Sequence, residues 1–384
     1  MIKLVSDTID KNDINHLIEW LSQDEIPRLT KGELTTQLEK KWANKIGTKY
    51  SVFVNSGSSS ILLTLAALKF TNRLKNNKVV VPSLSWATDL SSPMLLGLEP
   101  ILCDCNLNDL SCDLEHLEKI FKTESPSALI LVSVLGLVPD MKLILELCDK
   151  YNVLLLEDVC ESMGSKYKEE YLGTFGLASF FSMYFGHHLS TIEGGFINTN
   201  DKDLYNSLLM MRSHGWSRDL SPEDQNLYNT QYNTDSFSSL YNFYLPGMNL
   251  RSTDLQAFIG LRAIDKLDDY SQKRNLNFKF YLKNLTNSEL NIKINPIDFI
   301  SNFAMPIVSK NKDQIIKDLI EANIEVRPLI AGNLGNKPVW YENYEKVNLP
   351  NSDIIDKFGF YLPNHQDLTK SDILKITNIV NKNI

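Results

Sequence analysis

The chain has 384 residues, of which 43% are hydrophobic and 22% charged, and its formal net charge at pH 7 is −8. This length and composition suit one large α/β core with a smaller second domain. The acidic balance argues against a general nucleic-acid-binding protein, because such proteins carry clustered lysine and arginine. The apolar runs fall far short of the roughly 20 residues that cross a membrane, and residues 1–7 lack a signal-peptide pattern. We therefore expect a cytoplasmic protein.

The cysteines indicate neither a disulfide framework nor a metal site. They are odd in number and lack a paired CxxC spacing, which disfavours both. Two neighbouring ligands without a second pair cannot complete a structural zinc site. We expect all five to be ordinary thiols: Cys103, Cys105, Cys112, Cys148 and Cys160.

Short apolar runs alternate with helical patterns between residues 50 and 200. Such alternation is typical of βαβ units and a mainly parallel sheet, in which active sites lie at the carboxyl ends of the strands. The predicted strands are Tyr50–Val54, Lys78–Val81, Pro100–Cys105, Ala128–Val134, Val153–Glu157, Ser179–Ser182 and Gly195–Asn198.

The pattern changes after residue 201. A helix over Lys202–Ser213 is followed by a polar, irregular stretch over Trp216–Tyr241 and a long helical segment over Thr253–Leu285. The remainder indicates a small α+β domain. Its predicted strands are Phe303–Val308 and Ile324–Arg327, and its predicted helices are Asp313–Ala322 and Lys370–Val380. We predict a large domain over residues 1–255, with a helical segment at its start, and a C-terminal domain over residues 256–384.

A possible phosphate site follows the first predicted strand. The segment Asn55–Ser60 opens an apolar helix that continues over Ile61–Leu68. The first turn of a helix has free backbone N–H groups, which bind anions. Serine and glycine at this position are also ordinary helix caps. This segment alone leaves both interpretations open.

The strand that ends in Glu157 and Asp158 brings a carboxylate to the expected cleft. Such a residue can be a strand-end cap or a turn residue. It can also hold a pyridine nitrogen protonated, which makes the ring an electron sink.

The segment Phe181–Gly195 presents two adjacent histidines, His187 and His188, before a Glu-Gly-Gly sequence. Together with the phosphate site and Asp158, it resembles the pyridoxal-phosphate-dependent nucleotide-sugar aminotransferase (DegT/DnrJ/EryC1/StrS) family. Its members carry a lysine six residues before the glutamate of that sequence, where this chain has His187. Similar segments span nearly the whole chain: Leu29–Gly32, Leu38–Ile46, Ser85–Trp86, Arg212–Arg218, Leu245–Arg251, Val326–Pro328 and Pro363–Gln366.

The resemblance implies an aspartate-aminotransferase-like α/β fold (fold type I), a pyridoxal or pyridoxamine 5'-phosphate cofactor, and a homodimer with shared active sites. Trp86, assigned to the pyridine face, could instead be an aromatic core residue. The other implied cofactor contacts are Gly57, Ser58 and Ser182 to the phosphate, Asp158 to the ring nitrogen, Glu161 to the ring hydroxyl, and Asn249 to the phosphate of the neighbouring subunit.

The resemblance also gives candidates for substrate binding. His214 and Arg218 match substrate-facing positions, while Lys31, Arg251 and Arg327 could supply the cations that a nucleotide diphosphate requires. Each of these charged residues could equally form a surface ion pair. Since adjacent side chains on an extended segment diverge, His188 could be a structural or interface residue, or could take part in the chemistry.

The change from lysine to histidine alters the expected reaction. A lysine amine binds the cofactor aldehyde covalently, which imidazole cannot do stably. The resemblance to the dehydratase members of the family implies noncovalent pyridoxamine phosphate, whose amine condenses with a 4-keto sugar. His187 would be the base that leads to loss of the C3 hydroxyl. The resemblance favours GDP-4-keto-6-deoxy-D-mannose as the substrate, in 3,6-dideoxysugar biosynthesis, with glutamate as the amino donor. The residues themselves leave open a CDP-linked sugar or a heptose.

Two alternatives remain open at this point. Another lysine, such as Lys166 or Lys168, could support aminotransferase chemistry, or the fold could serve a noncatalytic binding protein. A related CDP-sugar dehydratase with the same histidine has an iron–sulfur cluster on cysteines beyond it. This chain has no cysteine after Cys160, so we expect no such cluster.

Overall fold

The computed structural model describes residues 1–235, 237–286, 292 and 294–383. A seven-stranded sheet forms its centre, in the order β1-β9-β8-β5-β4-β2-β3. The strands from β8 to β3 run parallel, whereas β9 is antiparallel to both of its neighbours. The mainly parallel sheet is therefore confirmed. Its strands are β1 (Tyr50–Val54), β2 (Lys78–Pro82), β3 (Glu99–Cys103), β4 (Ala128–Val132), β5 (Leu154–Asp158), β8 (Ala178–Ser182) and β9 (Gly195–Thr199).

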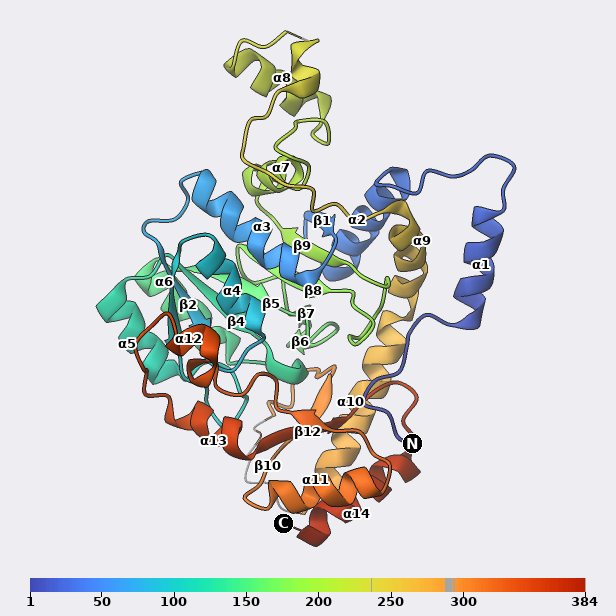
Figure 1. Cartoon of the computed structure of the whole chain (residues 1–384), viewed down its shortest axis with the longest axis vertical. Coiled ribbons are helices and arrows are strands. Elements are labelled where there is room, and N and C mark those ends of the chain that lie inside the picture. The colour runs from blue at the N-terminus through green and yellow to red at the C-terminus, as the bar shows by residue number, and fades with distance from the viewer. Residues whose placement is uncertain (236, 287–291, 293, 384) are drawn as a thin grey trace.

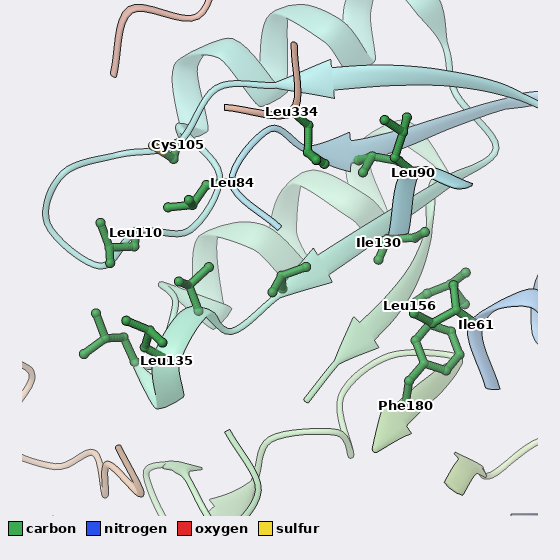
Figure 2. Packing of buried hydrophobic residues seen from close by; sticks show 14 of the residues in the cluster. Ile61, Leu84, Leu90, Cys105, Leu110, Ile130, Leu135, Leu156, Phe180 and Leu334 are labelled. Atoms are coloured by element: carbon green, nitrogen blue, oxygen red, sulfur yellow. The ribbon is translucent and has the colours of Figure 1, made fainter. Parts of the chain in front are cut away.

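Helices cover both faces of this sheet (Figure 1). They are α2 (Glu33–Ile46), α3 (Gly57–Phe70), α4 (Ala87–Leu95), α5 (Leu114–Glu124), α6 (Met141–Tyr151), α7 (Lys202–Met211) and α9 (Asp254–Ala263). Alternate side chains of a strand point to opposite faces, so each face has its own core. Val79 and Ile130 belong to one core, and Val80 and Leu129 to the other. Figure 2 shows the first core, in which Ile61 of α3 and Leu90 of α4 approach the sheet.

Two predicted strands end earlier than expected. The strand from Ala128 stops at Val132, because the next residues form a 3-10 turn over Val134–Gly136 in which Leu135 has φ +53°. The strand predicted to reach Cys105 stops at Cys103. The backbone of Cys105 instead forms an isolated antiparallel bridge with that of Cys112, and both thiols are free. Both turns lie at the carboxyl edge of the sheet, where the chain changes direction.

A smaller antiparallel sheet, ordered β10-β12-β11, contains β10 (Ala304–Val308), β12 (Gly359–Pro363) and β11 (Arg327–Pro328). The prediction of a strand over Ile324–Arg327 was largely wrong. The strand β11 begins only at Arg327, and Ile324 instead forms a backbone bridge with Ile2. The start of the chain therefore packs beside the C-terminal region. The helices of this part are α10 (Leu267–Asn284), α11 (Lys312–Glu321), α12 (Pro338–Tyr341), α13 (Pro350–Phe358) and α14 (Lys370–Asn383).

The stretch predicted to be irregular contains a helix, α8 (Pro222–Gln231), at the end of an arm that projects beyond α7 (Figure 1). Ser221 caps it by accepting a hydrogen bond from Asp224 N, and Pro222 occupies the first turn. These start signals stabilise a helix even though its only buried residue is Asp224. The prediction relied on polar composition and missed them.

The long helical segment predicted over Thr253–Leu285 is two helices, α9 and α10, joined by a 3-10 turn over Ile264–Lys266. The remaining elements are helix α1 (Lys11–Leu21) and the small hairpin of β6 (Lys166–Tyr167) and β7 (Glu170–Tyr171). Among the described residues, no helix combines the length and apolar character needed to cross a membrane.

Candidate active site

A cavity of about 650 Å³ opens at the carboxyl ends of β1, β4, β5 and β8. Residues of α3, α4 and the small sheet complete its walls. Many of the predicted site residues come together here although they are distant in sequence. Those that line the cavity are Gly57, Ser58, Trp86, Asp158, Glu161, Ser182, His187 and Arg327.

The start of α3 forms a cradle at one end of the cavity. Ser56 caps the helix through its side chain, which accepts a hydrogen bond of 3.1 Å from Ser59 N. The N–H groups of Gly57 and Ser58 lack acceptors within the helix, as in any first turn. A Cβ atom on Gly57 would lie 2.8 Å from Cβ of Ser182, so only glycine allows β8 to approach this closely. The cradle fits a phosphate group.

Carboxyl groups form the floor. Asp158, at the end of β5, is buried, and its Oδ1 accepts a hydrogen bond of 2.8 Å from Cys160 N. Burial raises its pKa. Glu157, the neighbour on the strand, instead accepts from the backbone N–H groups of Gly173, Phe175 and Gly176. Of the two carboxylates noted in the sequence, one therefore stabilises a turn and the other lines the cavity.

Glu161 follows in the same loop. Its Oε2 accepts a hydrogen bond of 2.9 Å from Leu135 N, a residue whose left-handed backbone directs that N–H toward the carboxyl group. Burial raises the pKa of Glu161 to about 8. At neutral pH it is therefore mainly an uncharged acid that can donate a hydrogen bond.

Asp89 is a cavity residue that the sequence analysis missed. It lies in the first turn of α4, is fully buried and lines the cavity beside Asp158. Burial, followed by the charge of Asp158, raises its pKa well above the usual range. The sequence offered one hint, namely that Asp89 follows the predicted site residue Trp86 by three positions. That spacing does not reveal that Asp89 lies beside Asp158, which is 69 positions further along the chain.

The two adjacent histidines have different environments. His187 lines the cavity, and its ring centroid lies 5.5 Å from that of Phe303. Its Nδ1 has no hydrogen-bond partner among the described residues. Burial and then the charge of Arg274 lower its pKa to about 4, so the imidazole is neutral at pH 7. His188 is fully buried, and its Nε2 lies 2.9 Å from the carbonyl oxygen of Ser301. The premise of an extended segment was wrong, because both histidines lie in a bend and both rings pack against Phe303. Only His187 lines the cavity, whereas His188 connects the loop to the segment that precedes β10.

Arg274 on α10 is a second residue that the sequence did not reveal. It is fully buried, and its Nη1 donates to the carbonyl oxygens of Phe303, at 3.1 Å, and Asn364. Phe303 thus contacts both groups, since its carbonyl oxygen accepts from Arg274 and its ring packs against the two histidine rings. Burial lowers the pKa of Arg274 to about 10, so it remains a cation behind the histidines.

The other predicted site residues do not line the cavity of one chain. Lys31 forms a 2.9 Å ion pair with Asp219. The guanidinium of Arg218 lies 4.0 Å from the ring centroid of Trp216, against which His214 also packs. Asn249 accepts a hydrogen bond of 3.3 Å from the backbone N–H of Arg251. Their roles stay predictions that require a neighbouring subunit.

The lysines proposed as substitutes for the missing anchor lie elsewhere. Lys166 and Lys168 pack over the rings of Tyr171 and Tyr167 on the β6–β7 hairpin. Within the described part of the chain, the cavity lining contains no lysine, and Arg327 is its one lysine or arginine. The structured residues also contain no group of three or more histidine, cysteine or acidic side chains placed to hold a metal ion.

Comparisons with known proteins agree with this geometry. Residues 7–381 match the model of the DegT/DnrJ/EryC1/StrS aminotransferase family. GDP-4-keto-6-deoxy-D-mannose 3-dehydratase of Yersinia pseudotuberculosis is 34% identical, over 99% of this chain and 98% of the relative. A crystal structure of GDP-4-keto-6-deoxymannose-3-dehydratase with a trapped PLP-glutamate geminal diamine superposes with a TM-score of 0.88 and 30% identity, covering 99% of this chain and 100% of that one. A histidine-to-asparagine variant of that enzyme with bound GDP-perosamine has a TM-score of 0.87 and 30% identity, covering 99% of this chain and 100% of that one.

Proposed function

The chain belongs to the DegT/DnrJ/EryC1/StrS aminotransferase family, and on that premise we propose that it is a pyridoxal-phosphate-dependent lyase that removes the C3 hydroxyl of GDP-4-keto-6-deoxy-D-mannose. The observation that carries this proposal is His187, a neutral imidazole on a cavity whose described lining has no lysine. The fold is that of the aminotransferases. The anchor that retains the cofactor covalently in transamination is replaced by a base.

The residues present fit the cofactor. Gly57, Ser58 and Ser182 would hold its phosphate at the start of α3, where free N–H groups meet the end of β8. Asp158 would face the ring nitrogen, and the acid of Glu161 would donate to the ring hydroxyl. When bound, pyridoxamine phosphate supplies an amine that joins the sugar ketone and a ring that delocalises the electrons released by proton removal.

His187 would accept that proton. A neutral imidazole has a free lone pair, and its setting beside Phe303 restricts the water that would otherwise compete for it. Trp86 would stack on the pyridine face of the cofactor through its exposed ring, and Arg327 would contact the sugar nucleotide through its charge. Glutamate would then restore the amine on the cofactor.

We also propose that the functional unit is a homodimer. Among the residues that line the cavity, Trp86, Tyr184 and Phe185 are exposed in one chain, and a second copy would cover such apolar side chains. His214, Arg218, Asn249, Arg251 and Lys31 would then contribute to the neighbouring site, where the arginines and the lysine suit a nucleotide diphosphate. We place the enzyme in the cytoplasm, in 3,6-dideoxysugar biosynthesis for surface polysaccharide such as O-antigen. The division into residues 1–255 and 256–384 also remains our proposal.

The direct test is product analysis. The purified protein, incubated with pyridoxamine phosphate, glutamate and GDP-4-keto-6-deoxy-D-mannose, should yield a sugar that lacks the C3 hydroxyl by mass spectrometry and NMR. His187→Asn is the matched control and should yield none. An amino sugar that retains its C3 hydroxyl would indicate an aminotransferase instead. A protein that gives no cofactor absorbance band with pyridoxamine phosphate would indicate a noncatalytic relative.

The shared site has its own test. Neither His187→Asn nor Arg251→Ala should be active alone. If each site uses residues of both chains, mixed dimers of the two variants contain one intact site and should regain part of the activity. A monomer in light scattering at assay concentration, or mixtures that stay inactive despite subunit exchange, would contradict the homodimer proposal.

A further inference from the structure

The floor of the cavity contains a carboxyl group for which the proposed chemistry has no use. Asp89 is fully buried, and neither of its oxygens accepts a hydrogen bond from a donor in the part of the chain that the structure describes. A buried polar group without a partner destabilises a protein by about 1–3 kcal/mol, and an unpaired charge by more. Such a residue on a cavity wall indicates a functional demand.

The groups that face Asp89 show which protonation state it adopts. They are the carboxyl groups of Asp158 and Glu161 and the hydroxyl of Ser85. Ser85 Oγ has a single proton, and it is placed to donate to the carbonyl oxygen of Pro82 at 3.1 Å. Two neighbouring buried carboxyl groups do not both ionise, so the pair shares a proton. Of the two, only Asp158 accepts a backbone hydrogen bond, from Cys160 N, so the negative charge belongs on Asp158 and the proton on Asp89.

We propose that Asp89 is a positioning residue of the cofactor site, a neutral acid whose O–H donates to Asp158 and holds that carboxylate toward the ring nitrogen of the cofactor. Cys160 N fixes one oxygen of Asp158, and the Asp89 acid fixes the group from the side of α4. A hydrogen bond to a carboxylate stabilises its charged form. The proton shared by Asp158 and the ring nitrogen therefore stays on the nitrogen, where it makes the ring an effective electron sink.

The inference deepens the proposed function at its cofactor, but its readouts need no sugar. A protein that binds the cofactor and fails to dehydrate a sugar would contradict the proposed function and leave this inference standing. The probe is pyridoxal 5'-phosphate itself. Its absorbance reports the protonation of the ring, and its affinity is measured by titration.

Two variants distinguish the effect of the hydrogen bond from Asp89 to Asp158 from the effect of the volume that the Asp89 side chain fills. Asp89→Asn keeps the shape and an N–H donor toward Asp158, whereas Asp89→Leu keeps a similar volume without a donor. In Asp89→Leu we expect the pH midpoint of the ring-nitrogen transition to fall by about one unit and the affinity for the cofactor to fall about tenfold. Asp89→Asn should stay close to the wild type in both. If the leucine variant does not fold, Asp89→Ala takes its place with the same expectation.

Ser85→Ala is the matched control, because it removes the one hydroxyl among the groups that face Asp89. It should leave the midpoint unchanged. Three results would overturn the inference: a donor-free variant that binds and titrates like the wild type, an asparagine variant as impaired as leucine, or a Ser85→Ala shift as large as that of Asp89→Leu. A donor-free variant like the wild type would mean that Asp89 only fills space. An impaired asparagine variant would mean that the carboxylic acid proton, and no other donor, is needed. A large Ser85→Ala shift would mean that Ser85 is the partner that sets the midpoint.

Discussion

On the floor of the cavity lie the carboxyl groups of Asp89, Asp158 and Glu161, and on the wall lies His187, with His188 and Arg274 buried behind it. Burial shifts the pKa values of the two regions in opposite directions. It raises the pKa of the three acids and lowers that of the two histidines, because a dry environment disfavours every charged form. At neutral pH Asp89 and Glu161 on the floor therefore hold protons, while His187 on the wall is a free proton acceptor.

Acids on the floor and a neutral imidazole on the wall suit a reaction in which one proton moves to a base. The acidic floor would keep the cofactor ring protonated, and the histidine wall would take a proton from the atoms above it. Arg274 strengthens the difference, because its buried charge opposes a second cation at His187. The four predictions below change one region at a time, from the largest expected effect to the smallest.

Replacing the base should have the largest effect. His187→Lys restores an amine at the position of the covalent anchor, so dehydration should fall by about 10²-fold or more and borohydride should trap the cofactor on the chain. Turnover and intact mass measure the two outcomes. His188→Asn is the neighbouring control, and it should reduce stability through its contact with Ser301 without trapping the cofactor. Unchanged dehydration in His187→Lys would place the base elsewhere.

Arg274→Met removes the cation behind the wall. Two carbonyl oxygens, those of Phe303 and Asn364, lose their donor, which should lower the free energy of unfolding by about 1–3 kcal/mol. The pKa of His187 should rise, since one cause of its depression is gone. The active neutral form is then lost at a higher pH, so the acid limb of the kcat/KM profile should move upward.

Arg274→Lys keeps a charge at this position with fewer donors. It should lose stability but retain an acid limb near that of the wild type. A methionine variant whose acid limb does not move would show that burial alone sets the charge state of His187.

Glu161→Gln tests the floor through stability. The pKa of Glu161 rises from 4.5 to about 8 on folding, so the unfolded chain releases its proton first as pH increases. Its contribution is therefore neutral below pH 4.5, becomes destabilising as pH rises toward about 8, and is constant above that. Relative to the glutamine variant, the cofactor-free wild type should lose up to about 5 kcal/mol across this window. Denaturant unfolding at several pH values measures it, and parallel curves for the two proteins would contradict the raised pKa.

Charges outside the cavity should matter least. Lys202 and Asp224 form a 2.9 Å ion pair between α7 and the projecting arm, and the lysine side chain is 53% exposed. Lys202→Ala should change the free energy of unfolding by about 0.2–1 kcal/mol and leave the cofactor spectrum as it is. A loss as large as that of Arg274→Met would mean that exposed and buried charges contribute alike here.

The two regions also differ in what the sequence revealed. Asp158 and His187 could be found, because one ends a recognisable strand and the other stands in a motif position. The strands were predictable since their apolar runs are buried on both sides, as in β4 and β8. These features depend on local sequence.

Asp89 and Arg274 depend on tertiary packing. Asp89 meets Asp158 only when α4 packs on the central sheet, and Arg274 reaches Phe303 only when α10 packs against the small sheet. Neither contact has a local pattern. The helix α8 and the strand β12 were missed for a different reason, since the first is mostly polar and the second follows directly on α13, with Gly359 serving both as the helix cap and as the first strand residue.

The charge state of His187 tests the account most directly. In protein labelled with ¹⁵N-histidine, the imidazole signal that disappears in His187→Asn identifies this residue. We predict that it remains neutral at pH 6 and takes up a proton only near pH 4. A His187 that titrates near the ordinary value of 6.5 would contradict the account, because the wall would then not be the dry, cation-excluding region on which the proposed base depends.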